Sequence, residues 1–405
     1  MTSNGRRPDN SERKISGEFS RRDFVKLAAL VALCTGGIYY LPGVIIGVGQ
    51  ELKRLDSIDY GFEDGVIRYQ TTTFNGIGGP TVQEQQSINV IDAPAVGDEQ
   101  LATVRTEMSG SAVASMGGAA IEFALLNHEN PASNGAIVYN MGIGGNFHHP
   151  VGAREAEVLA YANPDKRILV INNTGSGQSS LVPRNIMKQM KRDGIYQPQG
   201  EWMLQILEKQ LEEYGDKIEL WGNSAGARVA MGMAAAFGAA GQNIANLRVV
   251  DPPSAIDRTA LGIQMRFISQ ILAMQKYGAS PYNETSDLGK APSNLFTAKG
   301  AFADNMWNYP LTMRIKDGLV ADLQGAMGAV HDDLTIIQPE FSEFAHPNYM
   351  SWLVESAIAN TFWEGIKQPE ALRQIIIKDH SHAILSANAG ARPQITLYEI
   401  AKMAG

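Results

Sequence analysis

Cysteine is almost absent from this 405-residue chain, in which Cys34 stands alone. A single cysteine can form no disulfide within the chain and no cysteine-based metal site. The seven histidines include no His-Glu-x-x-His helix, and the close pairs are His148 with His149 and His380 with His382. The sequence therefore does not predict a metal ion.

Clustered cationic residues are also missing outside the N-terminus, and the formal net charge is -8. Binding to a phosphate backbone requires grouped lysines and arginines, so a nucleic-acid partner is not expected. Hydrophobic residues make up 44% of the chain. At this length such a composition can bury a large core, either in one large domain or in two modest ones.

The N-terminus has the composition of a targeting segment. Residues 1–26 are polar and charged, and the stretch Ser20-Arg21-Arg22-Asp23-Phe24-Val25-Lys26 resembles the twin-arginine export signal of bacteria. The uncharged segment 27–50 that follows is long enough to cross a bilayer, with its basic flank on the cytoplasmic side. We expect membrane association through 27–50, contact with the twin-arginine export machinery and a location at the bacterial cell envelope.

The fate of segment 27–50 stays open. No Ala-x-Ala cleavage site follows it, which favours an uncleaved anchor over a removed signal peptide. Because Gly-Gly and Leu-Pro-Gly interrupt the segment, a buried core helix is the alternative interpretation. Residues 51–100 are treated as an N-terminal extension of unassigned role.

From about residue 121 the chain alternates short apolar runs with stretches of helical length. The runs expected to form strands are Ile121–Leu126, Ala136–Met141, Arg167–Asn172, Lys217–Trp221, Leu247–Val250, Leu334–Ile337 and Gln374–Ile377. This alternation predicts an α/β domain over 101–405, with a mostly parallel sheet flanked by helices. The long interval of about 254–330 lacks clear strands and is expected to be an inserted helical lid.

A nucleophile turn is predicted at Ser224. The strand ending at Trp221 runs into Gly222-Asn223-Ser224-Ala225-Gly226, and a helix-forming stretch follows from Ala227. In such a G-x-S-x-G turn the glycines remove Cβ clashes and leave the serine hydroxyl projecting from the sheet. The flanking strand and helix make this more than a chance group of small residues.

Two further loops agree with this interpretation. The glycine-rich stretch Met141-Gly142-Ile143-Gly144-Gly145-Asn146 follows one strand, and Asn172–Ser179 follows the next. A phosphate-binding loop is the alternative for the first, but no G-x-x-x-x-G-K-[ST] string is present. Together with the Ser224 turn, these positions resemble the α/β-hydrolase superfamily. Asn172, Met141 and Glu343 depart from the usual Asp, His and Asp.

The resemblance implies a general base and an orienting acid after the serine. The loop after the last predicted strand holds His382, which we take as the base, with His380 as the alternative. The loop after Leu334–Ile337 holds Glu343, which we take as the acid. Glu340 and Asp251 remain alternative acids.

The resemblance also implies an oxyanion hole made by two backbone N–H groups. Ala225, directly after the nucleophile, supplies one, and Ile143 in the glycine-rich loop supplies the other. His148 and His149 have two interpretations, as residues lining the mouth of the site or as exposed loop residues.

The predicted function is that of a serine hydrolase that cleaves an ester or similar acyl bond through an acyl-enzyme. Its substrate is a small-molecule or lipid acyl compound, and no cofactor is implied. The alternatives are an acyltransferase, a peptidase or other chemistry on the same fold, and a non-catalytic binding module that kept the fold. The acyl chain length and the oligomeric state do not follow from the sequence.

Overall fold

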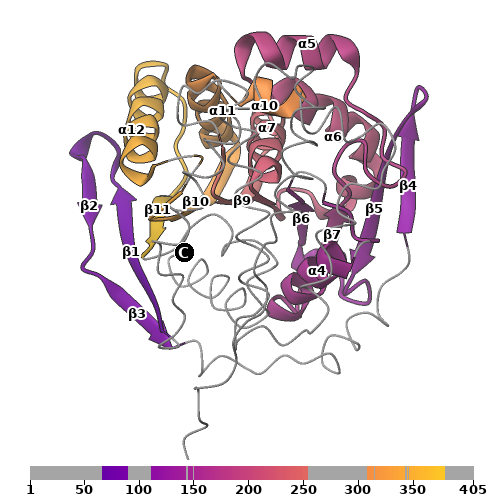
Figure 1. Ribbon diagram of the computed structural model, residues 1–405, viewed down its shortest axis with the longest axis horizontal. Coiled ribbons are helices and arrows are strands. Elements are labelled where there is room, and N and C mark those ends of the chain that lie inside the picture. The colour runs from indigo at the N-terminus through magenta and orange to yellow at the C-terminus, as the bar shows by residue number, and fades with distance from the viewer. Residues whose placement is uncertain are drawn as a thin grey trace, which may run out of the picture. The chain divides into compact units, whose positions relative to one another are not determined.

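A broad β-sheet with parallel central strands organises the part of the chain that can be described (Figure 1). The computed structural model describes residues 66–89, 111–142, 145–148, 150–253, 308–313, 315–342, 344 and 346–378. All of them belong to the unit Glu51–Gly405.

The strands are, in chain order, β1 Val66–Phe74, β2 Pro80–Val82, β3 Gln86–Asn89, β4 Ser111–Met116, β5 Ala119–Leu126, β6 Ala136–Asn140, β7 Arg167–Ile171, β8 Ile218–Asn223, β9 Ile244–Val250, β10 Val330–Pro339 and β11 Ala371–Ile377. The α-helices are α4 Pro150–Ala162, α5 Arg184–Asp193, α6 Gln197–Leu211, α7 Ala225–Ala239, α10 Tyr309–Thr312, α11 Lys316–Ala329 and α12 Pro347–Trp363. Short 3-10 turns span η2 Gly76–Gly78, η4 Ala132–Asn134 and η5 Glu212–Tyr214.

The strand order is β2-β1-β11-β10-β9-β8-β6-β7-β5-β4, and β3 pairs with β1. The strands from β7 through β6, β8, β9 and β10 to β11 are parallel to one another. Strands β5 and β4 on one side, and β1 on the other, are antiparallel additions. The prediction of a mostly parallel sheet flanked by helices is confirmed.

The strands predicted from the sequence correspond to β5 through β11. Every residue of β6 and β8 is buried. This is the reason that these strands read as continuous apolar runs, because a parallel strand is covered on both faces by its crossover helices. Strands β1 to β3 show that part of the predicted N-terminal extension belongs to the sheet.

Helices lie on both sides of the sheet. Helix α4 covers one face, and α6, α7, α11 and α12 cover the other (Figure 1). The apolar core lies on the second side, where Leu220, Leu247 and Ile336 of the sheet meet the helices. Helix α11 packs against α7 and α12, so this C-terminal portion of the predicted lid range is part of the helical layer.

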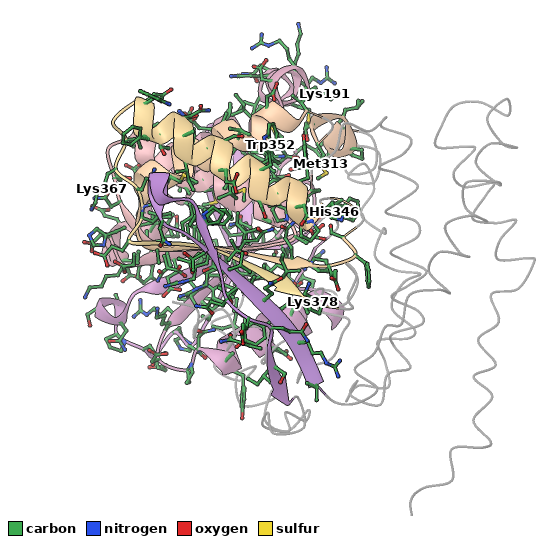
Figure 2. The ribbon with its side chains drawn as sticks, turned by 90° about the vertical axis from the view of Figure 1, so that its left-hand side faces the viewer. Lys191, Met313, His346, Trp352, Lys367 and Lys378 are labelled. Carbon is green, nitrogen blue, oxygen red and sulfur yellow. The ribbon has the colours of Figure 1, made fainter. Side chains whose placement is uncertain are left out.

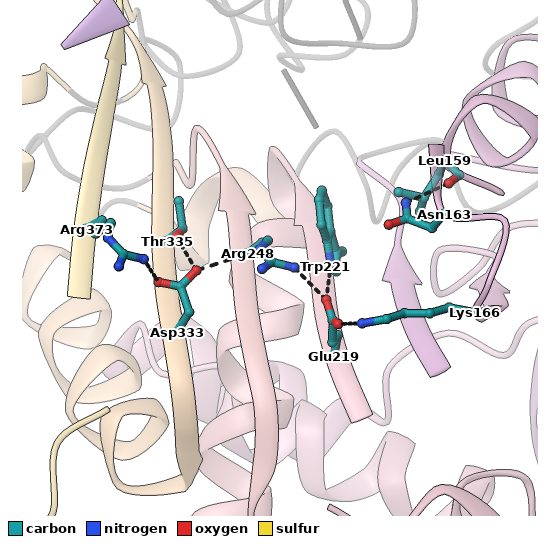
Figure 3. Close-up of polar contacts among 9 residues, drawn as sticks. All are labelled: Leu159, Asn163, Lys166, Glu219, Trp221, Arg248, Asp333, Thr335 and Arg373. Carbon is teal, nitrogen blue, oxygen red and sulfur yellow. Dashed lines mark hydrogen bonds and ion pairs between the residues drawn. The ribbon is translucent and has the colours of Figure 1, made fainter. Parts of the chain in front are cut away.

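Charged side chains span the strands on the α4 side of the sheet (Figure 3). Glu219 of β8 pairs with Lys166 and, at 2.6 Å, with Arg248 of β9. Asp333 of β10 lies 3.7 Å from Arg248 and 2.7 Å from Arg373 of β11. Burial lowers the pKa of Arg248 and raises that of Asp333, because desolvation disfavours the charged form of each group.

Several predictions from the sequence concern residues outside those described. These are the tail 1–26, the apolar segment 27–50, and the lid between 254 and 307. Among the described residues, no helix combines the length and the apolar composition that crossing a bilayer would need.

Candidate active site

Ser224 occupies a strained turn between β8 and α7. Its backbone has φ 55° and ψ -124°, a conformation that residues with a side chain rarely adopt. The Ser224 N–H donates a hydrogen bond of 2.8 Å to the Val250 carbonyl at the end of β9. Strain of this kind persists only where the surrounding structure enforces it, and it is the backbone of a nucleophile turn.

The two flanking glycines are required by close backbone contacts. A Cβ added at Gly226 would lie 2.0 Å from the Asn140 carbonyl oxygen, and one at Gly222 would lie 2.3 Å from the Gly226 oxygen. Any side chain at either position would push α7 away from the sheet. The glycines of the motif therefore allow the first turn of α7 to pack on the ends of β6 and β8.

The glycine-rich loop after β6 reaches the nucleophile. A Cβ added at Gly142 would lie 3.5 Å from the Ser224 Cβ, so this backbone runs directly beside the serine. Ala225 is the first residue of α7, and its N–H has no acceptor within the helix. Ile143, predicted to provide the second oxyanion donor, lies outside the described residues.

The loop after β7 holds the glycine-rich loop in place. Asn172 accepts a hydrogen bond of 2.8 Å from the Phe147 N–H through Oδ1. Asn173 donates one of 2.9 Å from Nδ2 to the Gly142 carbonyl, and its own N–H donates to the Gly145 carbonyl at 3.2 Å. The position of the loop beside Ser224 thus depends on two asparagine side chains.

Glu122 of β5 explains why residue 172 is Asn rather than the Asp of the related motif. Its carboxylate is fully buried and accepts hydrogen bonds of 2.7 Å from Asn172 Nδ2 and from the Gln178 N–H. An Asp at 172 could not donate and would place a second negative charge beside Glu122. In this chain the carboxylate of the group belongs to Glu122 of β5, and residue 172 of the loop is its neutral hydrogen-bond donor.

His148 completes this group, with its Nε2 at 2.7 Å from Glu122 Oε1. Burial alone would raise the pKa of Glu122, but the hydrogen bonds from Gln178, His148 and Asn172 outweigh it and hold the pKa below its usual value. Glu122 is therefore an ionised carboxylate that anchors both loops. Within the described residues, no group of three or more His, Cys, Asp or Glu side chains is placed to hold a metal ion.

Asp251 stands beside the nucleophile, directly after β9. Its side chain is fully buried, and its backbone φ is 43°. Ser342 Oγ lies 2.8 and 2.9 Å from the two carboxylate oxygens. Since Ser224 N–H bonds to the residue just before Asp251, the serine and this carboxylate occupy adjacent strand ends.

Glu340, another candidate acid, has a different environment from Asp251. Glu340 forms an ion pair of 3.0 Å with Lys378, and its side chain is partly exposed. Glu343, His380 and His382 lie outside the described residues. Of the carboxylates considered from the sequence, Asp251 and Glu340 can be compared, and Asp251 is the buried one next to Ser224.

The buried carboxyl group of Glu155 contacts the residue that precedes Ser224 in the nucleophile turn. Glu155 of α4 accepts a hydrogen bond from the Tyr139 hydroxyl and one of 3.3 Å from Asn223 Nδ2. Burial raises the pKa of Glu155, although both hydrogen bonds act in the opposite direction. Because Asn223 precedes Ser224 directly, this contact restrains the backbone of the turn.

Arg228 connects the nucleophile helix to the loop that follows Asp251. It is fully buried, four residues after Ser224. Its guanidinium donates hydrogen bonds of 3.2 Å to the Pro253 carbonyl and 2.9 Å to Asp322 of α11. The signal for this residue in the sequence is a single charge inside an Ala- and Met-rich helix, which belongs to no motif.

The mostly parallel sheet, the serine turn between β8 and α7 and the glycine-rich loop between β6 and α4 together define the α/β-hydrolase fold. No protein-family model matches the sequence, and no curated protein matches it.

Solved structures resemble the chain at low identity. A hydrolase from Pseudomonas aeruginosa is 14% identical, with 72% of this chain and 98% of that one covered and a TM-score of 0.45. A thermophilic esterase from Thermogutta terrifontis is 15% identical, with coverage of 73% and 100% and a TM-score of 0.44. A serine hydrolase from Cycloclasticus zankles is 12% identical, with coverage of 73% and 99% and a TM-score of 0.47.

Proposed function

We propose that this protein is a serine hydrolase that cleaves an ester or similar acyl bond, with Ser224 as the nucleophile. The observation that supports the proposal most directly is the strained Ser224 turn, with φ 55°, lying beside the Gly142 backbone. A fold gains nothing in stability from such a conformation, whereas it leaves a serine hydroxyl projecting beside backbone donors.

In the proposed mechanism, Ser224 Oγ attacks the acyl carbon while His382 accepts its proton. The Ala225 and Ile143 N–H groups stabilise the negative charge that develops on the carbonyl oxygen. His382 then protonates the leaving group, and a water molecule, activated by the same histidine, hydrolyses the acyl-enzyme and restores Ser224.

We assign the acid of this triad to Asp251, with Glu343 as the alternative. Asp251 is buried next to the nucleophile strand, and Ser342 fixes the orientation of its carboxylate. A buried carboxylate held in this way can orient the imidazole and stabilise its charged form. Glu340 is already engaged with Lys378.

The test is labelling by a fluorophosphonate and turnover of an activated ester. Ser224→Ala should abolish labelling and lower turnover by several orders of magnitude. Ser356→Ala is the matched control, because this serine lies on α12 and donates to the Trp352 carbonyl. Undiminished turnover in Ser224→Ala would refute the mechanism, and absence of labelling in the wild-type protein would favour a binding module.

The predicted segment 27–50 places this activity at a bacterial envelope in our proposal. Fractionation of cells tests it, since the full chain should sediment with membranes in high salt. Recovery of the full chain in the supernatant would contradict the anchor.

A further inference from the structure

A row of cations lies along the exposed face of α5, where the sequence pattern alone suggested no cluster. The residues concerned are Arg184, Lys188, Lys191 and Arg192. Their spacing of four, seven and eight residues from the first places them on one side of a helix. The adjoining side carries Met187 and Met190, which are buried.

Carboxylates of the described residues leave most of the row unneutralised. Asp193 is the one carboxylate of α5, and it pairs with the neighbouring Arg192 at 2.6 Å. No ion pair or hydrogen bond to a described residue engages the side chains of Arg184, Lys188 or Lys191. Figure 2 shows Lys191 on α5, at the outer margin of the described residues.

The stability of α5 explains only part of this arrangement, because Lys191 and Arg192 lie in the last turn, where the helix dipole favours cations. Arg184 stands in the first turn, where the helix dipole disfavours a cation, and that turn has no acidic residue. Arg184 with Lys188, and Lys188 with Arg192, are like-charge pairs four residues apart, which weaken a helix. Pro183 provides no side-chain cap. Arg184 and Lys188 therefore cost local stability, and an external anionic partner would offset that cost.

We infer that α5 docks on an anionic lipid surface and holds the active site next to it. A straight row of cations on an exposed helix suits a broad negative surface, and each lysine or arginine near such a surface adds to the attraction. Leu181, 44% exposed just before α5, adds an apolar contact at the same end. The predicted apolar segment 27–50 of the same chain favours a bilayer over any other anionic partner.

The position of α5 connects this surface to the site. The loop after β7, whose Asn173 holds Gly142 beside Ser224, leads directly into α5. Helix α5 also contacts α10, and Thr174 of the same loop lies 2.5 Å from the Tyr309 hydroxyl of α10. A surface bound by α5 would therefore lie close to the glycine-rich loop and to α10.

The experiment uses the full chain with a fluorophore on α5. Cys34→Ser and Asn185→Cys place a single label beside the row, at an exposed position. Vesicles of phosphatidylcholine, with or without phosphatidylglycerol, carry a quencher on their headgroups. We expect quenching by the anionic vesicles that weakens in high salt, and little quenching by the neutral ones.

Lys188→Gln with Lys191→Gln should weaken the response to anionic vesicles by about tenfold or more. Lys209→Gln with Lys367→Gln removes the same charge from exposed positions elsewhere and should leave the response unchanged. Circular dichroism verifies that both variants are folded. The basic N-terminal tail is retained in every protein, so it cannot account for a difference between them.

Three results would overturn the inference: equal quenching by neutral vesicles, equal loss in the two double variants, or a response to duplex DNA in place of vesicles. Hydrolysis of a soluble ester is measured in the same samples and should be unaffected by Lys188→Gln with Lys191→Gln. If the wild-type protein lacks that activity, the proposed function fails while the vesicle result still decides the role of α5.

Discussion

Several positions around Ser224 require a side chain with a particular hydrogen-bonding capacity, and size alone would not satisfy them. Asn172 both donates to Glu122 and accepts from the Phe147 N–H, which an aspartate of the same shape could not do. Asp251 likewise depends on Ser342, which lies 91 residues away in the sequence. The chemistry of each position is therefore set by a partner that is distant in the sequence.

The assignment of Asp251 is tested by Asp251→Asn. The amide keeps the shape but cannot stabilise a charged imidazole, so kcat should fall by about 10³–10⁴. Hydrolysis of an activated ester measures this. Glu343→Gln and Glu340→Gln are the controls and should retain most of the activity. A large loss in Glu343→Gln with little change in Asp251→Asn would transfer the role to Glu343.

The sequence predicts features formed by neighbouring residues, and it leaves open those that depend on contacts between residues far apart in the chain. Ser224 was predictable because its turn needs small residues at adjacent positions, and these are visible in five letters. The acid was not, since Asp251, Glu340 and Glu343 are all loop carboxylates after strands. Only the contact of Asp251 with Ser342, and that of Glu340 with Lys378, distinguishes two of them.

At the scale of elements, the helical layer is held together by a buried ion pair. Arg228 of α7 and Asp322 of α11 are both fully buried, and Asp322 also accepts hydrogen bonds of 3.0 Å from the Tyr196 N–H before α6. One carboxylate thus joins three helices, and Arg228 extends the link to the loop after Asp251. Such a pair is costly to break from one side, because the remaining charge loses its partner.

Asp322→Ala should lower the free energy of unfolding by about 3–5 kcal/mol, because Arg228 is left buried without its carboxylate. Urea unfolding followed by circular dichroism measures the change. Asp317→Ala, at an exposed position in the first turn of the same helix, is the control and should change stability by less than about 1 kcal/mol, since it loses only the interaction of a carboxylate with the helix dipole. A similar small change for Asp322→Ala would show that the pair is not important for the helical layer.

The central strands were predicted and the outer ones were not, for a physical reason. Strands β6 to β9 are buried on both faces and appear as apolar runs. Strand β1 alternates buried and half-buried residues and includes three consecutive threonines, Thr71 to Thr73, so it does not appear as a continuous apolar run. Its partner β11 comes about 300 residues later in the sequence, between Ala371 and Ile377, and no local feature of the sequence indicates that pairing.

At the scale of the whole molecule, two buried carboxyl groups near the site should give stability opposite dependences on pH. The pKa of Glu122 is lowered from 4.5, so its contribution is complete above that value and is lost as the pH falls through its folded-state pKa. The pKa of Glu155 is raised from 4.5, so its contribution is complete below that value and is lost as the pH rises through its folded-state pKa.

Glu122→Gln should therefore reduce the loss of stability on the acid side, and Glu155→Gln should reduce the loss on the neutral side. The free energy of unfolding in urea, measured at a series of pH values, checks both. Glu201→Gln, an exposed glutamate of α6, should leave the curve of the wild-type protein unchanged. If all three variants gave parallel curves, neither buried group would control the pH dependence.

The pairing of β1 with β11 has a consequence for the order in which the domain is assembled. Tyr69 aligns with Ile377, so one of the first described strands is completed by the last. A ribosome must synthesise almost the whole domain before this edge can close, and pairings so distant in sequence form slowly. Until then the backbone groups on the outer side of β11 have no strand beside them, which makes the nascent chain vulnerable to aggregation. A chaperone that shields this edge during synthesis would raise the yield of folded protein.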